Sequence, residues 1–460
     1  MLPLGSCCST ASDSSAPSNK VIKMENDDVQ SSWSLHGNRD ITSRYEILER
    51  VGSGTYSDVY RGRRKEDGLI VALKEIHDYQ SSLREIEALC RLRLTGSPNV
   101  VWLYEWFWRE HEDAVLVLEF LQSDLYSVIR SAKKDGMGIP EREVKTWMIQ
   151  VLQGVADCHA NFVVHRDLKP SNLLISADGV LKVADFGQAR ILEEPVTNST
   201  GECEHPDDMV VDVLGERRLE NSVNAEKLPN EGDVNSTSAT ESTSEGFAKP
   251  GHSDLGWKNE GMAESELTCG VGTRWYRAPE LLYGATVYGK EVDLWSLGCI
   301  FGELLILEPL FPGTSDVDQL SRLVRVLGSP TEENWPGCSN LPDYGKICFP
   351  GNSSHLGLKN HVPNCSESAF SILERLVCYD PTARLNAAEV LENRYFIEEP
   401  IPALAHELKV PPPQKDDEIC SDDEWDKRKN DESDSDFEGM DGFNVIHSST
   451  GFSIQFEKFP

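Results

Sequence analysis

The chain has 460 residues, of which 39% are hydrophobic and 26% are charged, and its formal net charge is −33. This length suffices for two lobes and a large core, whereas the low apolar share indicates that part of the chain does not fold. The acidic charge argues against binding to nucleic acid or to an anionic membrane surface. No run of 18 apolar residues predicts a membrane span. The 12 cysteines lack paired metal-site spacing, which favours reduced thiols and an intracellular protein of the nucleus or the cytoplasm.

The N-terminal part of the chain predicts a small β-rich lobe. Residues 1–43 are rich in serine and have no hydrophobic period, so we expect a disordered leader there. Short apolar runs separated by turn residues then predict a mostly antiparallel sheet, interrupted by one helix at 82–94. The predicted strands are 45–51, 58–61, 69–75, 101–108 and 114–119. These elements make up a lobe at 44–119.

From residue 120 onward the hydrophobic period becomes helical. Apolar residues recur at helical spacing in 144–155 and in 317–327. We therefore expect a larger helical lobe at 120–396 and an α+β fold class. Two acidic segments break the pattern, namely 192–264, with 17 acidic and 5 basic residues, and the tail at 397–460. Both are predicted to be mostly disordered, and either an inert or a docking role fits the first.

A glycine-containing loop connects the first two predicted strands. Two glycines there let backbone N–H groups approach phosphate oxygens, although a tight hairpin would explain them about as well. The loop opens no helix and lacks Gly-Lys-Ser/Thr, which argues against a dinucleotide fold and a Walker A site. The candidate nucleotide-binding residues of this loop are Val51, Gly52, Ser53, Gly54, Thr55, Tyr56, Ser57, Asp58 and Val59. Ser57 stands where a glycine-rich loop of this kind usually has its third glycine, and we expect only a modest effect on loop mobility.

Four further motifs follow in a fixed order. They are Val71-Ala-Leu-Lys74, His165-Arg-Asp-Leu-Lys-Pro-Ser-Asn172, Asp185-Phe-Gly187 and Ala278-Pro-Glu280. Taken alone, the lysine would be an ordinary strand residue and the aspartate an ordinary turn residue. Their order and spacing resemble those of protein kinases. The resemblance implies a bilobal protein kinase fold and transfer of the γ-phosphoryl group of ATP to serine or threonine.

The resemblance also assigns catalytic roles. Phosphoryl transfer depends on positioning and charge neutralisation more than on covalent help. Lys74 would hold the α- and β-phosphates, and Glu85 is the best candidate for its carboxylate partner, although it also fits a solvated helix face. Asp167 would orient the substrate hydroxyl, and Lys169 would balance charge on the γ-phosphate.

Further residues are expected to bind magnesium and the nucleoside. Asp185 and Asn172 would supply the oxygen ligands that Mg²⁺ prefers. The side chains expected to sandwich the adenine are Val51, Val59, Ala72 and Leu174, and each of them would serve equally well as ordinary core. The backbone of Glu119–Leu121 is expected to bind the edge of the adenine, and Asp124 is expected to bind the ribose.

Other motifs resemble the cyclin-dependent kinases. Arg84-Glu-Ile86 is similar to the end of their signature helix, and Thr273-Arg-Trp-Tyr-Arg-Ala-Pro-Glu-Leu281 to the close of their activation segment. The Asp185-Phe-Gly-Gln-Ala-Arg190 stretch resembles CDK-activating and cell-cycle-related kinases. With the acidic insertion and tail, the chain is similar to the plant F-type cyclin-dependent kinases. That resemblance implies that the substrates are the activation threonines of other CDK-activating kinases.

Two features concern activation. Lys74 and Glu85 are 11 residues apart, several fewer than in cyclin-bound relatives, so we expect that no cyclin is required. Thr268 lies five residues before Thr273, where the family has its activating phosphothreonine. The matching phosphate-binding residues are Arg84, Arg166 and Arg190, and Thr55 with Tyr56 matches a pair that inhibitory kinases phosphorylate in relatives.

Further residues match structural positions of the same family. Asp293 matches the structural aspartate of the helical lobe, and Arg384 is expected to pair with Glu280. Gly272 occupies a position whose backbone is strained in proline-directed relatives, and the sequence does not determine whether proline is required after the target residue. The chain also fits a catalytically silent scaffold, or a cell-cycle-related kinase with other substrates.

Overall fold

The computed structural model describes residues 35–54, 57–108, 114–193, 270, 272–349, 355–412, 443–448 and 451–456. The predicted insertion at 192–264 lies almost entirely outside these residues, as do the expected regulatory sites Thr55, Tyr56 and Thr268. In the part of the chain that is described, no helix is long and apolar enough to cross a membrane.

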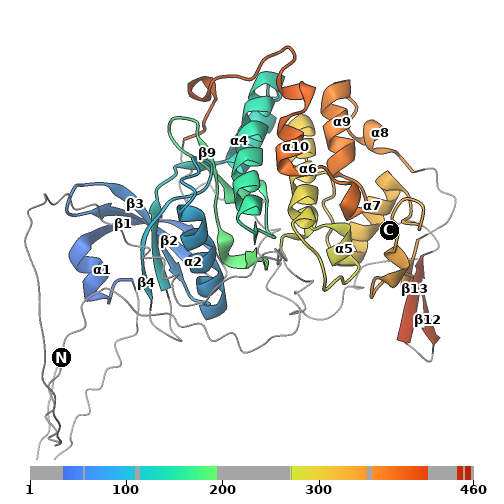
Figure 1. Cartoon of the computed structure of the whole chain (residues 1–460), viewed down its shortest axis with the longest axis horizontal. Helices are drawn as coiled ribbons and strands as arrows, with labels where there is room; N and C mark the ends of the chain where they lie inside the picture. Colours follow the sequence, from blue (N-terminus) through green and yellow to red (C-terminus); the bar gives the residue numbers. More distant parts are fainter. Residues whose placement is uncertain are drawn as a thin grey trace, which may run out of the picture. The chain divides into compact units, whose positions relative to one another are not determined.

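The first lobe is built on a five-stranded sheet whose neighbouring strands pair antiparallel, as predicted (Figure 1). In spatial order, its strands are β1 (Tyr45–Ser53), β2 (Ser57–Arg64), β3 (Ile70–Ile76), β5 (Ala114–Glu119) and β4 (Leu103–Trp108). Side chains alternate between the two faces of a strand. Val71 and Leu73 are therefore fully buried on one face of β3, whereas Lys74 lies on the other.

Helix α2 (Tyr79–Arg93) follows β3 after only His77 and Asp78. It begins three residues before the predicted start at 82, because the Asp78 side chain accepts a hydrogen bond from the Ser81 N–H at 2.7 Å and caps the helix. Its buried face includes Glu85 and Leu89. This two-residue connection therefore limits how far α2 can move from β3.

The predicted end of the leader at residue 43 is wrong. Residues 35–44 are folded and contain helix α1 (Arg39–Arg44), whose N-terminal N–H groups are capped by the Asn38 side chain. Leu35 and Ile41 are fully buried against the outer face of the sheet. Two isolated apolar residues within a polar, serine-rich stretch give no periodic signal, so the sequence pattern does not predict that this segment is folded.

The second lobe is mainly helical, and Figure 1 shows α4, α6, α9 and α10 side by side. The segments predicted at 144–155 and 317–327 lie within α4 and α7. The α-helices are α3 (Leu125–Asp135), α4 (Glu141–Ala160), α5 (Pro279–Leu282), α6 (Glu291–Ile306), α7 (Asp316–Leu327), α8 (Leu358–His361), α9 (Glu367–Leu376) and α10 (Ala387–Leu391).

Short elements connect these helices and carry the motifs. Strand β6 pairs with β8, β8 with β9, and β7 with β10, all antiparallel. These strands are β6 (Ser123–Asp124), β7 (Val163–Val164), β8 (Leu173–Ile175), β9 (Leu181–Val183) and β10 (Arg190–Ile191). The 3₁₀ turns are η1 (Pro170–Asn172), η2 (Phe186–Gln188), η3 (Arg274–Tyr276), η4 (Cys338–Asn340), η5 (Pro381–Ala383), η6 (Arg394–Phe396) and η7 (Ala405–Glu407).

A close approach between α4 and the chain before β4 positions β9. At Gly154, an added Cβ would lie 2.4 Å from the Asn99 carbonyl oxygen, so only glycine fits without a shift of backbone. That carbonyl accepts the Val183 N–H at 2.9 Å, and the Asn99 side chain donates to the Leu181 carbonyl at 2.8 Å. Strand β9 is thereby fixed immediately before the Asp185 motif.

The prediction of a disordered tail from residue 397 is also wrong in two places. Residues 397–412 lie along α4, where the Lys145 ammonium donates to the carbonyls of Glu398 and Pro400 at 2.8 Å. The Thr146 hydroxyl donates to the Ala403 carbonyl. Further on, β12 (Phe443–Ser448) and β13 (Gly451–Phe456) form a hairpin, and β13 pairs in parallel with β11 (Ile347–Cys348).

A buried carboxyl group in α6 supports the segment that precedes α5. Glu303 is 2% exposed, and its carboxylate accepts a hydrogen bond from the Tyr276 hydroxyl at 2.6 Å. Burial raises the pKa of Glu303 to about 7, even though the hydrogen bond from Tyr276 favours the charged form. The folded state therefore binds this proton more tightly than the unfolded state does.

This shift predicts a pH dependence of stability. Glu303 contributes stability that is fully present below its ordinary pKa of 4.5 and is lost as the pH rises through about 7. Glu303→Gln keeps a neutral group, so between pH 5 and pH 8 we expect wild type to lose about 2–3 kcal/mol more unfolding free energy than the variant. Urea titrations at the two pH values measure this difference. Glu392→Gln, at an exposed position, is the control. If wild type and Glu303→Gln differ in this pH-dependent loss no more than wild type and Glu392→Gln do, the raised pKa of Glu303 is contradicted.

Candidate active site

Lys74 of β3 lies in a buried ion cluster. Its Nζ lies 2.8 and 2.7 Å from the two carboxylate oxygens of Glu85 and 2.7 Å from Oδ1 of Asp185. Burial alone would lower the pKa of Lys74, but the carboxylates of Asp185 and Glu85 outweigh burial and raise it. The lysine is therefore held as a cation, in the predicted pair with Glu85.

Asp185 follows β9 and faces Lys74 from the second lobe. Its backbone has φ +65°, a left-handed conformation that is costly for a residue other than glycine. The next side chain, Phe186, is fully buried, with its ring centroid 4.9 Å from that of His165. The Lys74 ammonium lowers the pKa of Asp185 to about 2, so its carboxylate, which is 47% exposed, is ionised at neutral pH.

The loop that carries Asp167 is held by a buried aspartate. Asp293 in α6 accepts the backbone N–H groups of His165 at 2.9 Å and Arg166 at 2.8 Å, and it also bonds His159. Arg166 has φ +67°, a second left-handed backbone in this site. The His165 ring donates to the Ala184 carbonyl at 2.9 Å, which connects this loop to the residue before Asp185. Asp293 thus has the structural position expected for it.

Asp167 lies at the centre of a polar group. Its Oδ1 accepts the N–H of Thr273 at 2.6 Å and the hydroxyl of Thr273 at 2.8 Å, and the Lys169 ammonium lies 3.2 Å from its Oδ2. The Asn172 amide nitrogen donates a hydrogen bond to the Asp167 carbonyl at 2.8 Å. With the nitrogen directed toward Asp167, the amide oxygen can serve as a ligand for a cation. The Ala184 N–H donates to the Asn172 carbonyl. The four predicted residues Lys74, Asp167, Asn172 and Asp185 are therefore brought together.

The sequence does not predict the contact made by Thr273. Its motif matches the close of the activation segment but gives no role for the hydroxyl, which also accepts from the Lys169 ammonium at 3.1 Å. Because Thr273 lies 106 positions after Asp167, no local spacing reveals the pairing. Only its place in the activation-segment motif offered a signal.

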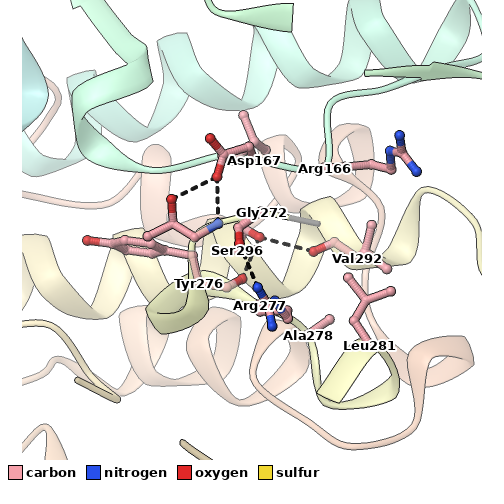
Figure 2. Close-up of a pocket in the computed structure, with 11 residues that line it drawn as sticks. Arg166, Asp167, Gly272, Tyr276, Arg277, Ala278, Leu281, Val292 and Ser296 are labelled. Carbon is pink, nitrogen blue, oxygen red and sulfur yellow. Dashed lines mark hydrogen bonds between the residues drawn. The ribbon is translucent and has the colours of Figure 1, made fainter. Parts of the chain in front are cut away.

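A small cavity lies beside Asp167, between the loop and the activation-segment close (Figure 2). Gly272 lines it with φ +81°, and an added Cβ would lie 2.4 Å from the Arg166 carbonyl. The Gly272 carbonyl accepts a hydrogen bond from Arg277 at 3.0 Å. Glycine therefore adopts, without side-chain strain, the backbone that the resemblance predicted for this position.

The expected nucleoside contacts lie on several strands around Lys74. Val59 pairs with Lys74 across β2 and β3, and Ala72 pairs with Leu118 of β5. Val51 is 41% exposed, unlike the fully buried Leu73. The remaining expected apolar contacts, Val59, Ala72, Leu121 and Leu174, are partly exposed. These positions suit an apolar surface for a flat ring, although each also packs within its lobe.

Two other expected contacts already have partners. Asp124 caps α3 by accepting the Ser127 N–H at 2.7 Å, and burial raises its pKa. Glu119 accepts from the Lys182 ammonium at 2.6 Å. In the phosphate loop, the Gly54 N–H donates to the Ser57 carbonyl at 2.8 Å, which closes the turn.

Three arginines gather beside the Asp185 motif. Arg84 donates to the Gly187 carbonyl at 2.8 Å, and Arg166 donates to the Gln188 carbonyl at 2.7 Å. Burial lowers the pKa of Arg84, and the nearby charges of Arg166 and Arg190 lower it further. The predicted phosphothreonine pocket is thus a cluster of like charges, to which an anion would bind favourably.

The expected pair of Glu280 and Arg384 is confirmed. Both side chains are buried, and two hydrogen bonds of 2.7 and 2.8 Å join the guanidinium group to the carboxylate. Such bidentate geometry compensates the cost of removing both charges from water. The pair fixes the close of the activation segment to the helical lobe.

Comparisons with known proteins agree with this geometry. The family model described as "Protein kinase domain" matches residues 45–214 and 252–396. Cyclin-dependent kinase F-1 from Arabidopsis thaliana is 46% identical, over 92% of this chain and 98% of that protein. The protein of the same name from Oryza sativa subsp. japonica is 47% identical, with the same coverage. Cyclin-dependent kinase 20 from Homo sapiens is 37% identical, over 80% of this chain and 87% of that protein.

A solved structure has a similar fold. It is titled "Structure of the CAK complex form Chaetomium thermophilum bound to ATP-gamma-S" and matches with a TM-score of 0.58 and 29% sequence identity. The match covers 81% of this chain and 98% of that one. The chain therefore belongs to the protein kinases and, within them, to the serine/threonine-specific cyclin-dependent kinase family.

Proposed function

We propose that this kinase phosphorylates the activation-segment threonine of other cyclin-dependent or CDK-activating kinases, and that it needs no cyclin. The substrate part is supported by the F-1 relatives, which cover almost the whole chain, and by the likeness to a CAK complex. A cell-cycle-related kinase with other substrates is the competing proposal, and it is supported by the likeness to cyclin-dependent kinase 20.

We propose the following role for each residue of the site. Lys74 would bind the α- and β-phosphates of ATP, because Glu85 holds its ammonium in place. Asp185 and the amide oxygen of Asn172 would hold Mg²⁺, which supplies charge neutralisation for the phosphates. Asp167 would orient the substrate hydroxyl, and Lys169 beside it would balance the charge on the γ-phosphate.

One observation carries the proposal of cyclin independence. Only two residues separate the end of β3 at Ile76 from the start of α2 at Tyr79, and the Lys74–Glu85 pair is formed within the chain itself. A helix tethered so closely has little freedom to swing away from β3. If the competent position of α2 already dominates in the isolated chain, a partner that prefers this position can raise its population only slightly, so a cyclin would have little to add.

The substrate proposal is tested by phosphosite mapping. The full-length chain is incubated with ATP and Mg²⁺ and with a catalytically inactive cyclin-dependent kinase. We expect phosphate on the activation threonine, loss of labelling when that threonine is alanine, and a rate at least about 100-fold lower for Asp167→Asn enzyme, because the carboxylate that orients the hydroxyl is gone. Labelling that persists after the threonine is replaced would contradict the substrate proposal.

Cyclin independence is tested on the same reaction with a panel of purified cyclins. Because the ion pair forms within the chain, we expect each cyclin to change kcat/KM by less than about twofold, which corresponds to about 0.4 kcal/mol. Isothermal titration measures binding in parallel. Activation of tenfold or more by any one cyclin would refute this part of the proposal.

Thr268 is proposed as the activating phosphorylation site. A phosphate carries nearly two negative charges, and the cluster of Arg84, Arg166 and Arg190 would bind it. We expect Thr268→Ala to lower kcat by roughly tenfold or more, because the segment loses the anion that orders it. The measurement compares kcat of phosphorylated wild type, Thr268→Ala and the neighbouring control Ser265→Ala. Equal rates for Thr268→Ala and Ser265→Ala would count against Thr268 as the activating site.

A further inference from the structure

The chain folds against the kinase domain before the family match begins. The match starts at residue 45, yet residues 35–44 already contain α1 and two fully buried side chains, Leu35 and Ile41. These two side chains cluster with Val71 and Leu73 of β3 and with buried valines of β5. They therefore cover the face of the sheet opposite the one that bears Lys74.

A buried hydrogen bond joins this segment to β3. The Leu35 N–H donates to Oε1 of Glu75 at 2.6 Å, and Glu75 is only 5% exposed. A carboxylate so deeply buried is costly unless it is hydrogen-bonded. Glu75 follows Lys74 directly in β3, so this bond fixes the strand at the neighbour of the catalytic lysine.

The other end of the segment is also anchored. The Arg44 guanidinium lies 2.6 Å from the Glu105 carboxylate of β4 and 4.6 Å above the Phe107 ring. The Lys65 ammonium donates to the Thr42 carbonyl at 2.6 Å. Residues 35–44 are thus attached to β3, to β4 and to the turn after β2.

The attachment to β3 bears directly on the active site. Glu75 is the penultimate residue of β3, and α2 begins three residues after Ile76. The end of the strand that Leu35 holds is therefore the end that leads into the helix carrying Glu85. Movement of this end would change the position of Lys74 relative to Glu85.

We propose that residues 35–44 act as an intramolecular brace, in which Leu35 and Glu75 are positioning residues for the Lys74–Glu85 pair. The brace holds β3 from the outer face, so that the site for the ATP phosphates forms within the single chain. This inference rests on the proposed cyclin-independent function, because it names the element that would make a partner unnecessary.

Point variants in the full-length chain test the brace. Leu35→Asp introduces a charge into the buried cluster, and Glu75→Leu removes the acceptor, whereas Leu35→Met and Glu75→Gln keep the volume and the acceptor oxygen. If the competent arrangement falls to about one tenth of molecules, the apparent affinity for nucleotide falls about tenfold. We expect Leu35→Asp and Glu75→Leu to weaken MgATP binding by roughly that factor, and Leu35→Met and Glu75→Gln to bind like wild type.

A stability control distinguishes positioning of the Lys74–Glu85 pair from simple burial of the outer face of the sheet. Leu408→Ala removes a buried side chain from the helical lobe and should lower Tm without changing nucleotide affinity. The brace is overturned if Leu35→Asp lowers Tm as this control does but leaves the Kd for MgATP unchanged, or if it changes neither.

The readout is independent of the proposed function. Titration calorimetry with MgATP and no protein substrate measures the affinity of every variant, whether or not a cyclin is needed for turnover. If wild type requires a cyclin for turnover, the proposed cyclin independence is refuted. The MgATP affinities of the variants would still show whether residues 35–44 act as a brace. Unchanged affinities in a cyclin-independent enzyme would refute the brace alone.

Discussion

The ion pair between Lys74 and Glu85 is the constraint on which the site depends. The two side chains are 10% and 1% exposed, so neither charge is compensated by water. Removing one partner of such a pair typically costs about 3–5 kcal/mol, because the other is left buried and uncompensated. Strand β3 and helix α2 must therefore keep one separation, and the two-residue connection between them limits the alternatives.

A second buried carboxylate organises the opposite lobe. Asp293 accepts the backbone N–H groups of His165 and Arg166, and the His165 ring bonds the carbonyl before Asp185. The loop of Asp167 and the strand end of Asp185 thus share one network. Two residues in this network have left-handed backbones, which persist only where surrounding contacts over-determine them.

Contiguous motifs made the chemistry predictable, whereas long-range contacts did not. Lys74, Asp167 and Asp185 each lie in a short motif whose order carries the information, and the sheet followed from alternation and turn residues. The partner of Asp167 at Thr273 is more than 100 residues away and depends on the folded activation segment. The sequence pattern does not predict the burial of Leu35 or the hairpin of β12 and β13, because short ordered segments are averaged out within polar, acidic or serine-rich stretches.

The most direct test of the Lys74–Glu85 constraint is a crystal structure of the full-length chain, determined without nucleotide or partner. We expect the Lys74 ammonium within hydrogen-bonding distance of both carboxylate oxygens of Glu85, with α2 starting directly after β3. A structure in which Glu85 points to solvent and α2 has moved away from Lys74 would contradict it.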